Sequence, residues 1–218
     1  MRKLIIFGGS GIGMISANIA KELGYYDVIG FLNDEIKIGE KIGLFQQYPV
    51  IGNSQDYINY LEDIDTDFFI GYVGMKKEKE VFNKIINFKI PSNRYATLIH
   101  PSAIIPKGYC KIGHGVLIAP LAQLSPDTII GDNCILLGNS FIGHNTVLDV
   151  FAHIATNAVV GSNVHIGKAV HIGSNATIKE KVNVGDFSLV GSGAVVLHDV
   201  DVNTIVVGNP AQVLKIKE

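Results

Sequence analysis

The sequence predicts an α/β, Rossmann-like N-terminal domain over residues 1–94, followed by a left-handed parallel β-helix of hexapeptide repeats over residues 95–218. Three observations lead to this fold class. In the second half of the chain an aliphatic residue recurs at every sixth position, and glycine or asparagine recurs in between. In the first half, short apolar runs alternate with helical patterns, which is typical of a parallel sheet covered by helices.

The six-residue repeat determines the architecture of the second half. A sandwich or a helical repeat does not demand an aliphatic residue at strict intervals of six. Three hexapeptides form one coil, and stacked coils pair their backbones about 4.8 Å apart. We expect this register to hold over residues 112–201. The aliphatic positions are Ile112, Ile118, Leu124, Ile130, Leu136, Ile142, Leu148, Ile154, Val160, Ile166, Ile172, Ile178, Val184, Val190, Val196 and Val202.

Each hexapeptide reads as a short strand followed by a tight turn. The fourth residue after each aliphatic position is small or β-branched, so two positions per hexapeptide are expected to point inward. Glycine and asparagine tolerate left-handed backbone angles, which the turns require. The recurring turn asparagines are Asn133, Asn139, Asn145, Asn157, Asn163 and Asn175.

The first half of the chain alternates between strand and helix signals. Apolar runs predict strands over residues 4–7, 27–32 and 67–73, and apolar periodicity predicts helices over residues 14–23, 54–61 and 76–88. Asn53 or Ser54 is suited to cap the second of these helices. Because strands that alternate with helices form a parallel sheet, this half predicts a small Rossmann-like domain.

A glycine-rich loop, residues 8–13, joins the first strand to the first helix. Its amides and the helix N-terminus are suited to bind a phosphate. A G-x-G-x-x-G fingerprint read from Gly9 would need glycine at Met14, and one read from Gly11 would need it at Ser16, so NAD is disfavoured. We expect a phosphate site without a nicotinamide, helped by Asn33 and Asp34 after the next strand; the alternative is a purely structural turn.

Composition excludes several classes of function. The chain is 47% hydrophobic and 17% charged, with a formal net charge of −2. No apolar run approaches the roughly 18 residues of a membrane span, and residues 1–7 are too short for a secretory signal. A basic field for nucleic acid or acidic membranes is missing. We therefore expect a cytoplasmic protein with no membrane insertion and no nucleic-acid partner.

Residues directly before the aliphatic positions point outward and form three columns, one on each face of the β-helix. Two columns are largely apolar, and such faces need partners, so we predict a homotrimer. The first column is Leu117, Ile135, His153, His171 and Leu189; the second is Gln123, Phe141, Val159, Thr177 and Val195; the third is Ile129, Val147, His165, Asn183 and Asp201.

Histidine titrates near neutrality and therefore suits proton transfer. His144 falls in the turn between the second and third columns, at the rim of the predicted interface between subunits. This position makes His144 a candidate general base. For His114, His165, His171 and His198 we expect ordinary surface roles.

Several motifs in their combined order resemble one family over essentially the whole chain. They are Gly8-Gly9-Ser10-Gly11, Phe31-Leu32-Asn33-Asp34, Val73-Gly74, His100-Pro101-Ser102-Ala103, Gly143-His144-Asn145, His153-Ile154-Ala155 and Gly208-Asn209-Pro210-Ala211. They are similar to the hexapeptide acyltransferases that N-acetylate nucleotide-linked amino sugars, including the sialic-acid O-acetyltransferase-like and bacillosamine-pathway enzymes.

The resemblance implies an acyltransferase that moves an acetyl group from acetyl-CoA directly to the amine at C4 of the sugar, without a metal. It implies His144 as the general base with Asn145 beside it. It also implies acetyl-CoA contacts from His153, Gly173, Ser174, Gly191 and Ser192, and nucleotide-sugar contacts from Gly9, Ser10, Gly11, Ile12, Asn33, Asp34 and Gly74.

Three positions depart from the family pattern. Asn145 stands where glutamate or aspartate commonly follows the base, Ile12 stands where many relatives have histidine, and Leu137 replaces a frequent asparagine. A neutral amine is a stronger nucleophile than a hydroxyl and tolerates a less activated base, so Asn145 favours N- over O-acetylation. The departures bear on the identity of the sugar more than on the reaction type.

Three alternatives stay open at this point. The first is a sugar O-acetyltransferase of the same fold. The second is a zinc enzyme similar to γ-type carbonic anhydrases, with His153, His165 and His171 as ligands, although those enzymes have no use for a phosphate-binding N-terminal domain. The third is a noncatalytic protein that only binds a nucleotide sugar.

Overall fold

The computed structural model describes residues 1–72 and 78–217, and the chain divides into two compact units. The N-terminal unit comprises Met1–Tyr72 and Asn87–Leu98, and the β-helix unit comprises Ile99–Glu218 together with the helix α2 (Glu78–Ile86). The sequence predicts α2 within the first domain and a boundary at residue 94. In the structure α2 groups with the second unit, and the first unit runs on to Leu98.

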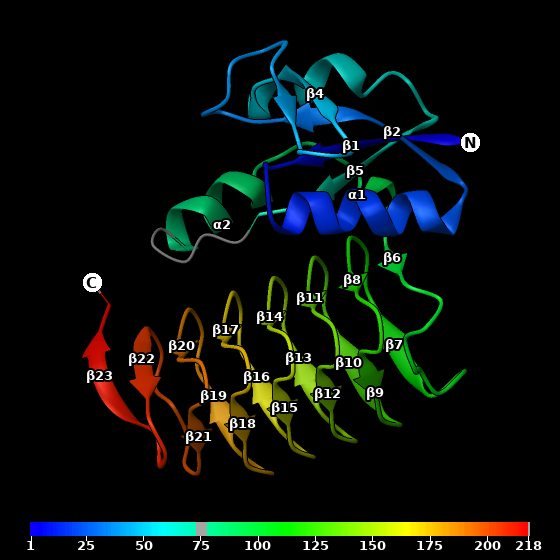
Figure 1. Ribbon diagram of the computed structural model, residues 1–218. Helices are drawn as coiled ribbons and strands as arrows, with labels where there is room; N and C mark the ends of the chain where they lie inside the picture. The colour runs from blue at the N-terminus through cyan, green and yellow to red at the C-terminus, as the bar shows by residue number, and fades with distance from the viewer. Residues whose placement is uncertain (73–77, 218) are drawn as a thin grey trace. The chain divides into compact units, whose positions relative to one another are not determined.

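The N-terminal unit is built on a five-stranded sheet with the order β3-β4-β2-β1-β5 (Figure 1). All neighbours run parallel except β3 and β4. Its elements are β1 (Arg2–Phe7), α1 (Ile12–Leu23), β2 (Tyr26–Leu32), β3 (Lys41–Ile42), β4 (Tyr48–Gly52), the 3-10 helix η1 (Ser54–Tyr60), β5 (Thr66–Ile70) and the 3-10 helix η2 (Ser92–Arg94).

Most elements of this unit match the prediction. Asn53 caps η1 in a capping box with Asp56, so the predicted cap is confirmed, although the helix is of the 3-10 type. Strands β3 and β4 were not predicted, because β3 has only two residues and Pro49 interrupts the apolar pattern of β4. The core contains four fully buried aromatic side chains, Phe7, Phe31, Phe68 and Phe69.

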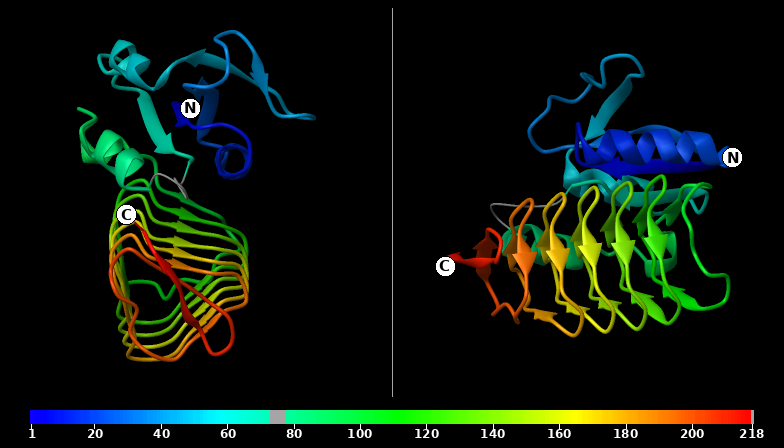
Figure 2. Two further views of the ribbon diagram at one scale, coloured as in Figure 1. Left: turned by 90° about the vertical axis from the view of Figure 1, so that its left-hand side faces the viewer. Right: turned by 60° about the horizontal axis from the view of Figure 1, so that its bottom comes forward.

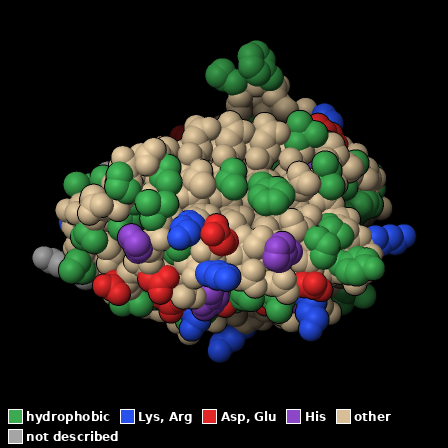
Figure 3. Space-filling model, turned by 90° about the horizontal axis from the view of Figure 1, so that it is seen from below, with side chains coloured by type: hydrophobic (Ala, Val, Ile, Leu, Met, Phe, Trp, Pro, Cys, Tyr) green, Lys and Arg blue, Asp and Glu red, His purple; other side chains and the backbone are tan. Residues whose placement is uncertain are grey.

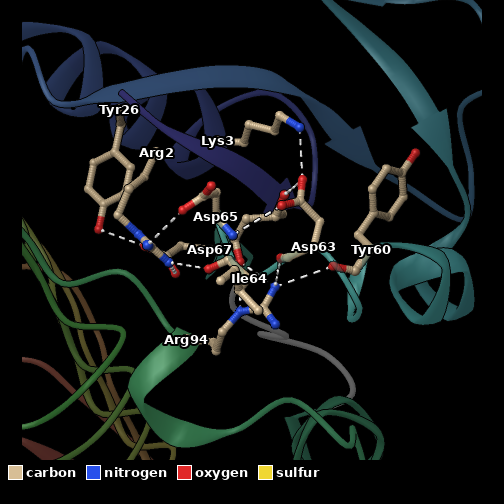
Figure 4. Close-up of polar contacts among 10 residues, drawn as sticks. Arg2, Lys3, Tyr26, Tyr60, Asp63, Ile64, Asp65, Asp67 and Arg94 are labelled. Carbon is tan, nitrogen blue, oxygen red and sulfur yellow. Dashed lines mark hydrogen bonds and ion pairs between the residues drawn. The ribbon is translucent and has the colours of Figure 1, made fainter.

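Two arginines hold the amino ends of β1 and β5 (Figure 4). Arg2 makes two hydrogen bonds of 2.7 Å to the buried carboxylate of Asp67. Arg94 donates to the backbone carbonyls of Leu61 and Asp63, each at 2.8 Å, and to that of residue 66. This network lies at the opposite end of β1 from the glycine-rich loop and has a structural role.

The β-helix unit consists of stacked coils whose strands form three sheets, parallel except for the final strand β23 (Figure 2). The sheet orders are β19-β16-β13-β10-β7, β21-β18-β15-β12-β9 and β23-β22-β20-β17-β14-β11-β8-β6. From residue 98 onward the strands are β6 (Leu98–Ile99), β7 (Cys110–Ile112), β8 (Leu117–Ile118), β9 (Gln123–Leu124), β10 (Thr128–Ile130), β11 (Ile135–Leu136), β12 (Phe141–Ile142), β13 (Val147–Leu148), β14 (His153–Ile154), β15 (Val159–Val160), β16 (His165–Ile166), β17 (His171–Ile172), β18 (Thr177–Ile178), β19 (Asn183–Val184), β20 (Leu189–Val190), β21 (Val195–Val196), β22 (Thr204–Val207) and β23 (Gln212–Ile216).

The predicted register is confirmed from Ile118 to Val196, where the aliphatic side chains form one buried core. It fails at the last predicted position. Val202 is 56% exposed, while Val206 is buried and pairs with Val190. The final coil is therefore two residues shorter than the repeat, which the sequence did not reveal because Val202 fits the pattern by chance.

The turns between strands adopt the left-handed conformation that asparagine was expected to provide. Asn145 and Asn157, for example, have φ angles of 59° and 60°. The glycines that follow the aliphatic positions are required for a different reason than the turn asparagines. A Cβ on Gly143 would lie 2.6 Å from the backbone of Gly161 and of Ser162, so the close approach of the next coil excludes a side chain there.

The three outward columns differ in burial. In the first column Leu117, Ile135 and His153 are at most 6% exposed within the single chain. Val159 of the second column is 39% exposed, and charged and histidine side chains form a band beside apolar ones on the underside of the β-helix (Figure 3).

Helix α2 packs its Phe82 ring edge-on against Phe151 and Phe187, with centroid distances of 5.5 Å to each. Both partners occupy left-handed turn positions of the β-helix, with φ angles of 62° and 59°. Large side chains at these two turns therefore serve to hold α2. Over residues 1–72 and 78–217, no helix combines the length and hydropathy needed to cross a bilayer.

Candidate active site

The carboxyl ends of the parallel strands in the N-terminal unit gather the first set of predicted residues. The glycine loop follows β1, and α1 begins at Ile12 with Gly11 as its N-cap, without a capping side chain. The amide of Gly8 donates to the carbonyl of Leu32 on β2, and that of Gly71 donates to Phe7 on β1. The loop is thus fixed at the end of the sheet where ligands of open α/β folds bind, with the first amides of α1 suited to an anion.

Asn33 holds this loop in place. Its Nδ2 donates to the carbonyl of Gly8 at 2.8 Å, and its Oδ1 accepts from the amides of Glu35 and Ile36 at 2.8 and 2.7 Å. A Cβ on Gly9 would approach the Asn33 Nδ2 to 3.1 Å. The amide group of Asn33 is therefore already engaged within the chain, and its role in the site is to position the loop.

Asp34 is exposed and accepts a 2.7 Å hydrogen bond from the amide of Ser54. Two neighbours, Ser54 and Tyr72, were not predicted as site residues, and Ser54 was expected only as a possible helix cap. The Ser54 hydroxyl is buried without a hydrogen-bond partner among the described residues. Burial, and secondarily the charge of Asp34, raises the pKa of Tyr72 to about 12. Tyr72 lies near the end of the predicted strand over residues 67–73, and Ser54 lies at the start of the predicted helix over residues 54–61, so these positions could have singled them out. Gly74 lies outside the described residues.

The β-helix unit contributes the predicted base. His144 is exposed in the turn between β12 and β13, and its Nδ1 lies 2.7 Å from the Oδ1 of Asn145. An amide oxygen only accepts, so Nδ1 must carry the proton and Nε2 keeps its lone pair. Asn145 thus takes the left-handed turn conformation and also accepts a hydrogen bond from the imidazole of His144.

His153 lies in a different setting from the one expected. It is 6% exposed, and its Nδ1 is 2.9 Å from the Nδ1 of His171 on the next coil. Burial, and secondarily the neighbouring His171, lowers the pKa of His153 to about 3, so the ring is neutral near pH 7. Its Nε2 is buried with no hydrogen-bond partner in the described part of the chain. Such an atom fits a ligand that supplies the missing partner.

The predicted coenzyme amides divide into two kinds. The amides of Gly173 and Gly191 donate to Val190 and Val206, each at 2.8 Å, and so belong to the coil-to-coil hydrogen bonds. These two amides are therefore engaged between coils, and a coenzyme contact by Gly173 or Gly191 would have to use other atoms. Among the described residues, no backbone bond uses the amides of Ser174 and Ser192 as donors.

The histidines of the zinc alternative do not converge. His153 and His171 contact each other, while the Nε2 of His165 lies 3.0 Å from the Oδ2 of Asp149 on an exposed face. Within residues 1–72 and 78–217, no three histidine, cysteine or acidic side chains are arranged to hold a metal ion. The arrangement therefore offers no support for a three-histidine zinc site.

Comparisons with known families match both units. The family model of the PglD N-terminal domain matches residues 3–85, and that of the bacterial transferase hexapeptide (six repeats) matches residues 109–144. A segment of 61 residues, 26% of this chain, is 36% identical to the acyl-[acyl-carrier-protein]–UDP-N-acetylglucosamine O-acyltransferase of Bartonella quintana. That segment spans only 22% of the relative.

Solved structures match over nearly the whole chain. The acetyltransferase domain of PglB from Neisseria gonorrhoeae is 28% identical, with a TM-score of 0.84 over 98% of this chain and 100% of that one. The same domain in complex with acetyl coenzyme A has a TM-score of 0.82 at 28% identity, over 98% and 99% of the two chains. A mutant of perosamine N-acetyltransferase from Caulobacter crescentus, in complex with CoA and GDP-perosamine, is 20% identical, with a TM-score of 0.85 over 98% and 97%, and shows the fold alone.

These matches define the class: the chain is a hexapeptide-repeat acyltransferase with an N-terminal domain of the PglD type. Within that class it is similar to the hexapeptide nucleotide-sugar acetyltransferases, in agreement with the family that the sequence motifs resemble.

Proposed function

We propose that this protein transfers an acetyl group from acetyl-CoA to the amino group, at C4, of a nucleotide-linked amino-deoxy sugar, with His144 as the general base. The observation that carries the proposal is the His144–Asn145 contact of 2.7 Å on an exposed turn. It leaves the Nε2 of His144 as a proton acceptor directed by a neighbour, in a chain that belongs to an acyltransferase family.

The reaction needs one proton acceptor and no resident cofactor. His144 Nε2 receives the proton that the amine loses as its nitrogen bonds to the thioester carbon. It returns that proton to the sulfur as the carbon–sulfur bond breaks. A positioned general base of this kind contributes about 10² to 10⁴ in rate. The acetyl-CoA-bound PglB domain supports acetyl-CoA as the donor.

The remaining predicted residues divide between the two substrates in this proposal. The amides at the start of α1 and the loop at Gly9, Ser10 and Gly11 bind the diphosphate, with Ile12 against the sugar. Asp34 contacts the nucleotide, while Asn33 positions the loop. His153 and the turn residues Ser174 and Ser192 contact acetyl-CoA. Gly74 is kept as a substrate contact from the family resemblance alone.

The decisive experiment is thiol release from acetyl-CoA with a panel of UDP-, dTDP- and GDP-linked 4-amino sugars and their 4-hydroxyl counterparts. We expect turnover of at least one amino sugar. Turnover of the hydroxyl sugars only would establish the O-acetyltransferase instead. Binding of a nucleotide sugar without any turnover would favour the noncatalytic alternative.

On the sugar that is turned over, His144→Ala is expected to lose at least about two orders of magnitude in kcat. His198→Ala is the matched control, because it removes an exposed histidine of the same unit that has no part in the proposal. Full activity in His144→Ala would remove this residue from its role.

The homotrimer and the cytoplasmic location remain part of the proposal. Val159 of the second column, at 39% exposure, and the half-buried Phe141 and Val195 support association of the β-helix unit. Light scattering at micromolar concentration tests this, and a monomer would contradict it.

A further inference from the structure

Two histidines occupy adjacent coils in a column that is otherwise aliphatic. His153 on β14 and His171 on β17 are paired in register, between Ile135 and Leu189. Their rings meet at 75° with centroids 4.5 Å apart, and the two Nδ1 atoms are separated by 2.9 Å. This distance is that of a hydrogen bond between the two ring nitrogens.

One proton must lie between these two nitrogens. A neutral imidazole carries a single N–H, so the contact has two possible arrangements. If His153 donates from Nδ1, its buried Nε2 is a bare acceptor. If His171 donates from Nδ1, the Nε2 of His153 carries the proton and is a donor. The state of His171 thus determines what His153 offers to a ligand.

Resting on the proposed function, we infer that His171 is a positioning residue whose Nδ1–H holds His153 in the tautomer with a proton on Nε2. The buried, unpartnered Nε2 of His153 then donates a hydrogen bond to the carbonyl oxygen of the bound acetyl group. A carbonyl oxygen only accepts, so its partner must be a donor. A fixed donor at this oxygen stabilises the negative charge that develops there as the amine attacks.

Nitrogen NMR of protein labelled with ¹⁵N-histidine tests the tautomer directly. With acetyl-CoA bound and no sugar present, we expect His153 to be protonated at Nε2 and bare at Nδ1, and His171 to be protonated at Nδ1. Spectra of His153→Phe and His171→Phe assign the signals. A proton on the Nδ1 of His153 in the complex would overturn the inference.

Kinetics test the coupling between the two rings. We expect His171→Phe to lower kcat/KM for acetyl-CoA about tenfold, as for loss of one polar contact, with the KM for the sugar unchanged. His171→Gln, whose amide can donate to the Nδ1 of His153, should recover most of this loss. In a double-mutant cycle, His153→Phe combined with His171→Phe should be no worse than His153→Phe alone.

A purely structural role for His171 predicts a different set of results. The two substitutions would then add, and His171→Gln would bring no recovery at equal thermal stability. If a variant does not fold, the tautomer in the unmodified protein still decides. Failure of the wild type to bind acetyl-CoA in calorimetry would contradict the proposed function and the inference with it. Normal turnover with unaffected His171 variants would contradict the inference alone.

Discussion

The two units of this protein are stabilised in different ways. This difference determines how easily a functional residue can be recognised from the sequence of each unit. In the N-terminal unit, four of the five strands have five to seven residues, and the core contains large aromatic side chains. In the β-helix unit, most strands have two residues, and each coil is held by the coils next to it. A departure from the repeat is therefore conspicuous in the second unit, whereas in the first unit site residues and structural residues look alike.

Truncation of the two cores is expected to have the largest effect and to separate the units. Leu136→Ala should destabilise the β-helix unit by about 2–5 kcal/mol, and Phe68→Ala should destabilise the N-terminal unit by about 3–5 kcal/mol, because both side chains are fully buried. Calorimetry should show each change in its own transition. If both changes lowered a single common transition, the division into two stability units would be wrong.

Glycine substitutions sharpen the comparison at the level of the backbone. A Cβ on Gly161 would lie 2.6 Å from the amide nitrogen of Glu180 in the next coil, whereas one on Gly24, at φ 75°, would meet nothing within 4 Å. We expect Gly161→Ala to cost about 3 kcal/mol through overpacking, and Gly24→Ala about 1 kcal/mol through its backbone angle. Equal losses in urea unfolding would show that coil spacing is less restrictive than the structure indicates.

Asn145 tests whether a turn residue of the repeat also acts in the reaction. Asn145→Ala should lower kcat about tenfold, because His144 loses the acceptor that orients its ring. Asn139→Ala is the matched control, since Asn139 has the same left-handed backbone, with φ 58°. The control should lose similar stability and keep its activity. Equal activity in both variants would show that Asn145 acts only as a turn residue and has no role in the reaction.

Acid should weaken the two units over different pH ranges. The folded-state pKa of His153 is about 3, below its ordinary value of 6.5, so the unfolded chain binds an extra proton as pH falls from about 6.5 to 3, and stability is lost there. Asp63, with a pKa of about 2 instead of 3.8, contributes a loss only between those two values. Thermal unfolding between pH 7 and 4.5 should therefore show a gradual loss in the β-helix unit.

The control for this acid effect is His153→Phe, which removes the titrating group. Its β-helix transition should depend less on pH over the same range, while the transition of the N-terminal unit stays constant in both proteins. An unchanged slope in His153→Phe would assign the acid sensitivity to other groups.

The sequence predicted the β-helix nearly residue by residue, because aliphatic spacing, left-handed asparagines and outward columns all follow one period. The prediction failed where the period ends: Val202 fits the pattern but is exposed, and a shortened turn brings Val206 inward. In the N-terminal unit, strand β4 was not predicted because Pro49 interrupts its apolar pattern.

The sequence predicted which residues lie at the candidate site better than it predicted the contacts that each of them makes. Gly8 to Gly11 and Asp34 lie at the expected sheet edge, but the hydrogen bonds of Asn33 are local and cannot be read from the residue type. Likewise, a one-dimensional pattern placed His153 and His171 in one column without showing that the rings share a proton. Whether a polar side chain faces a ligand or a neighbour depends on its rotamer, which spacing does not encode.

Strand β23 pairs antiparallel with β22. The neighbouring strands from β8 to β22 in the same sheet all pair in parallel. A solenoid that ended on a parallel rung would offer a template on which another molecule could continue the spiral. The reversed final strand gives an incoming chain the wrong polarity to extend it. The antiparallel strand β23 therefore disfavours the stacking of a further parallel coil on β22.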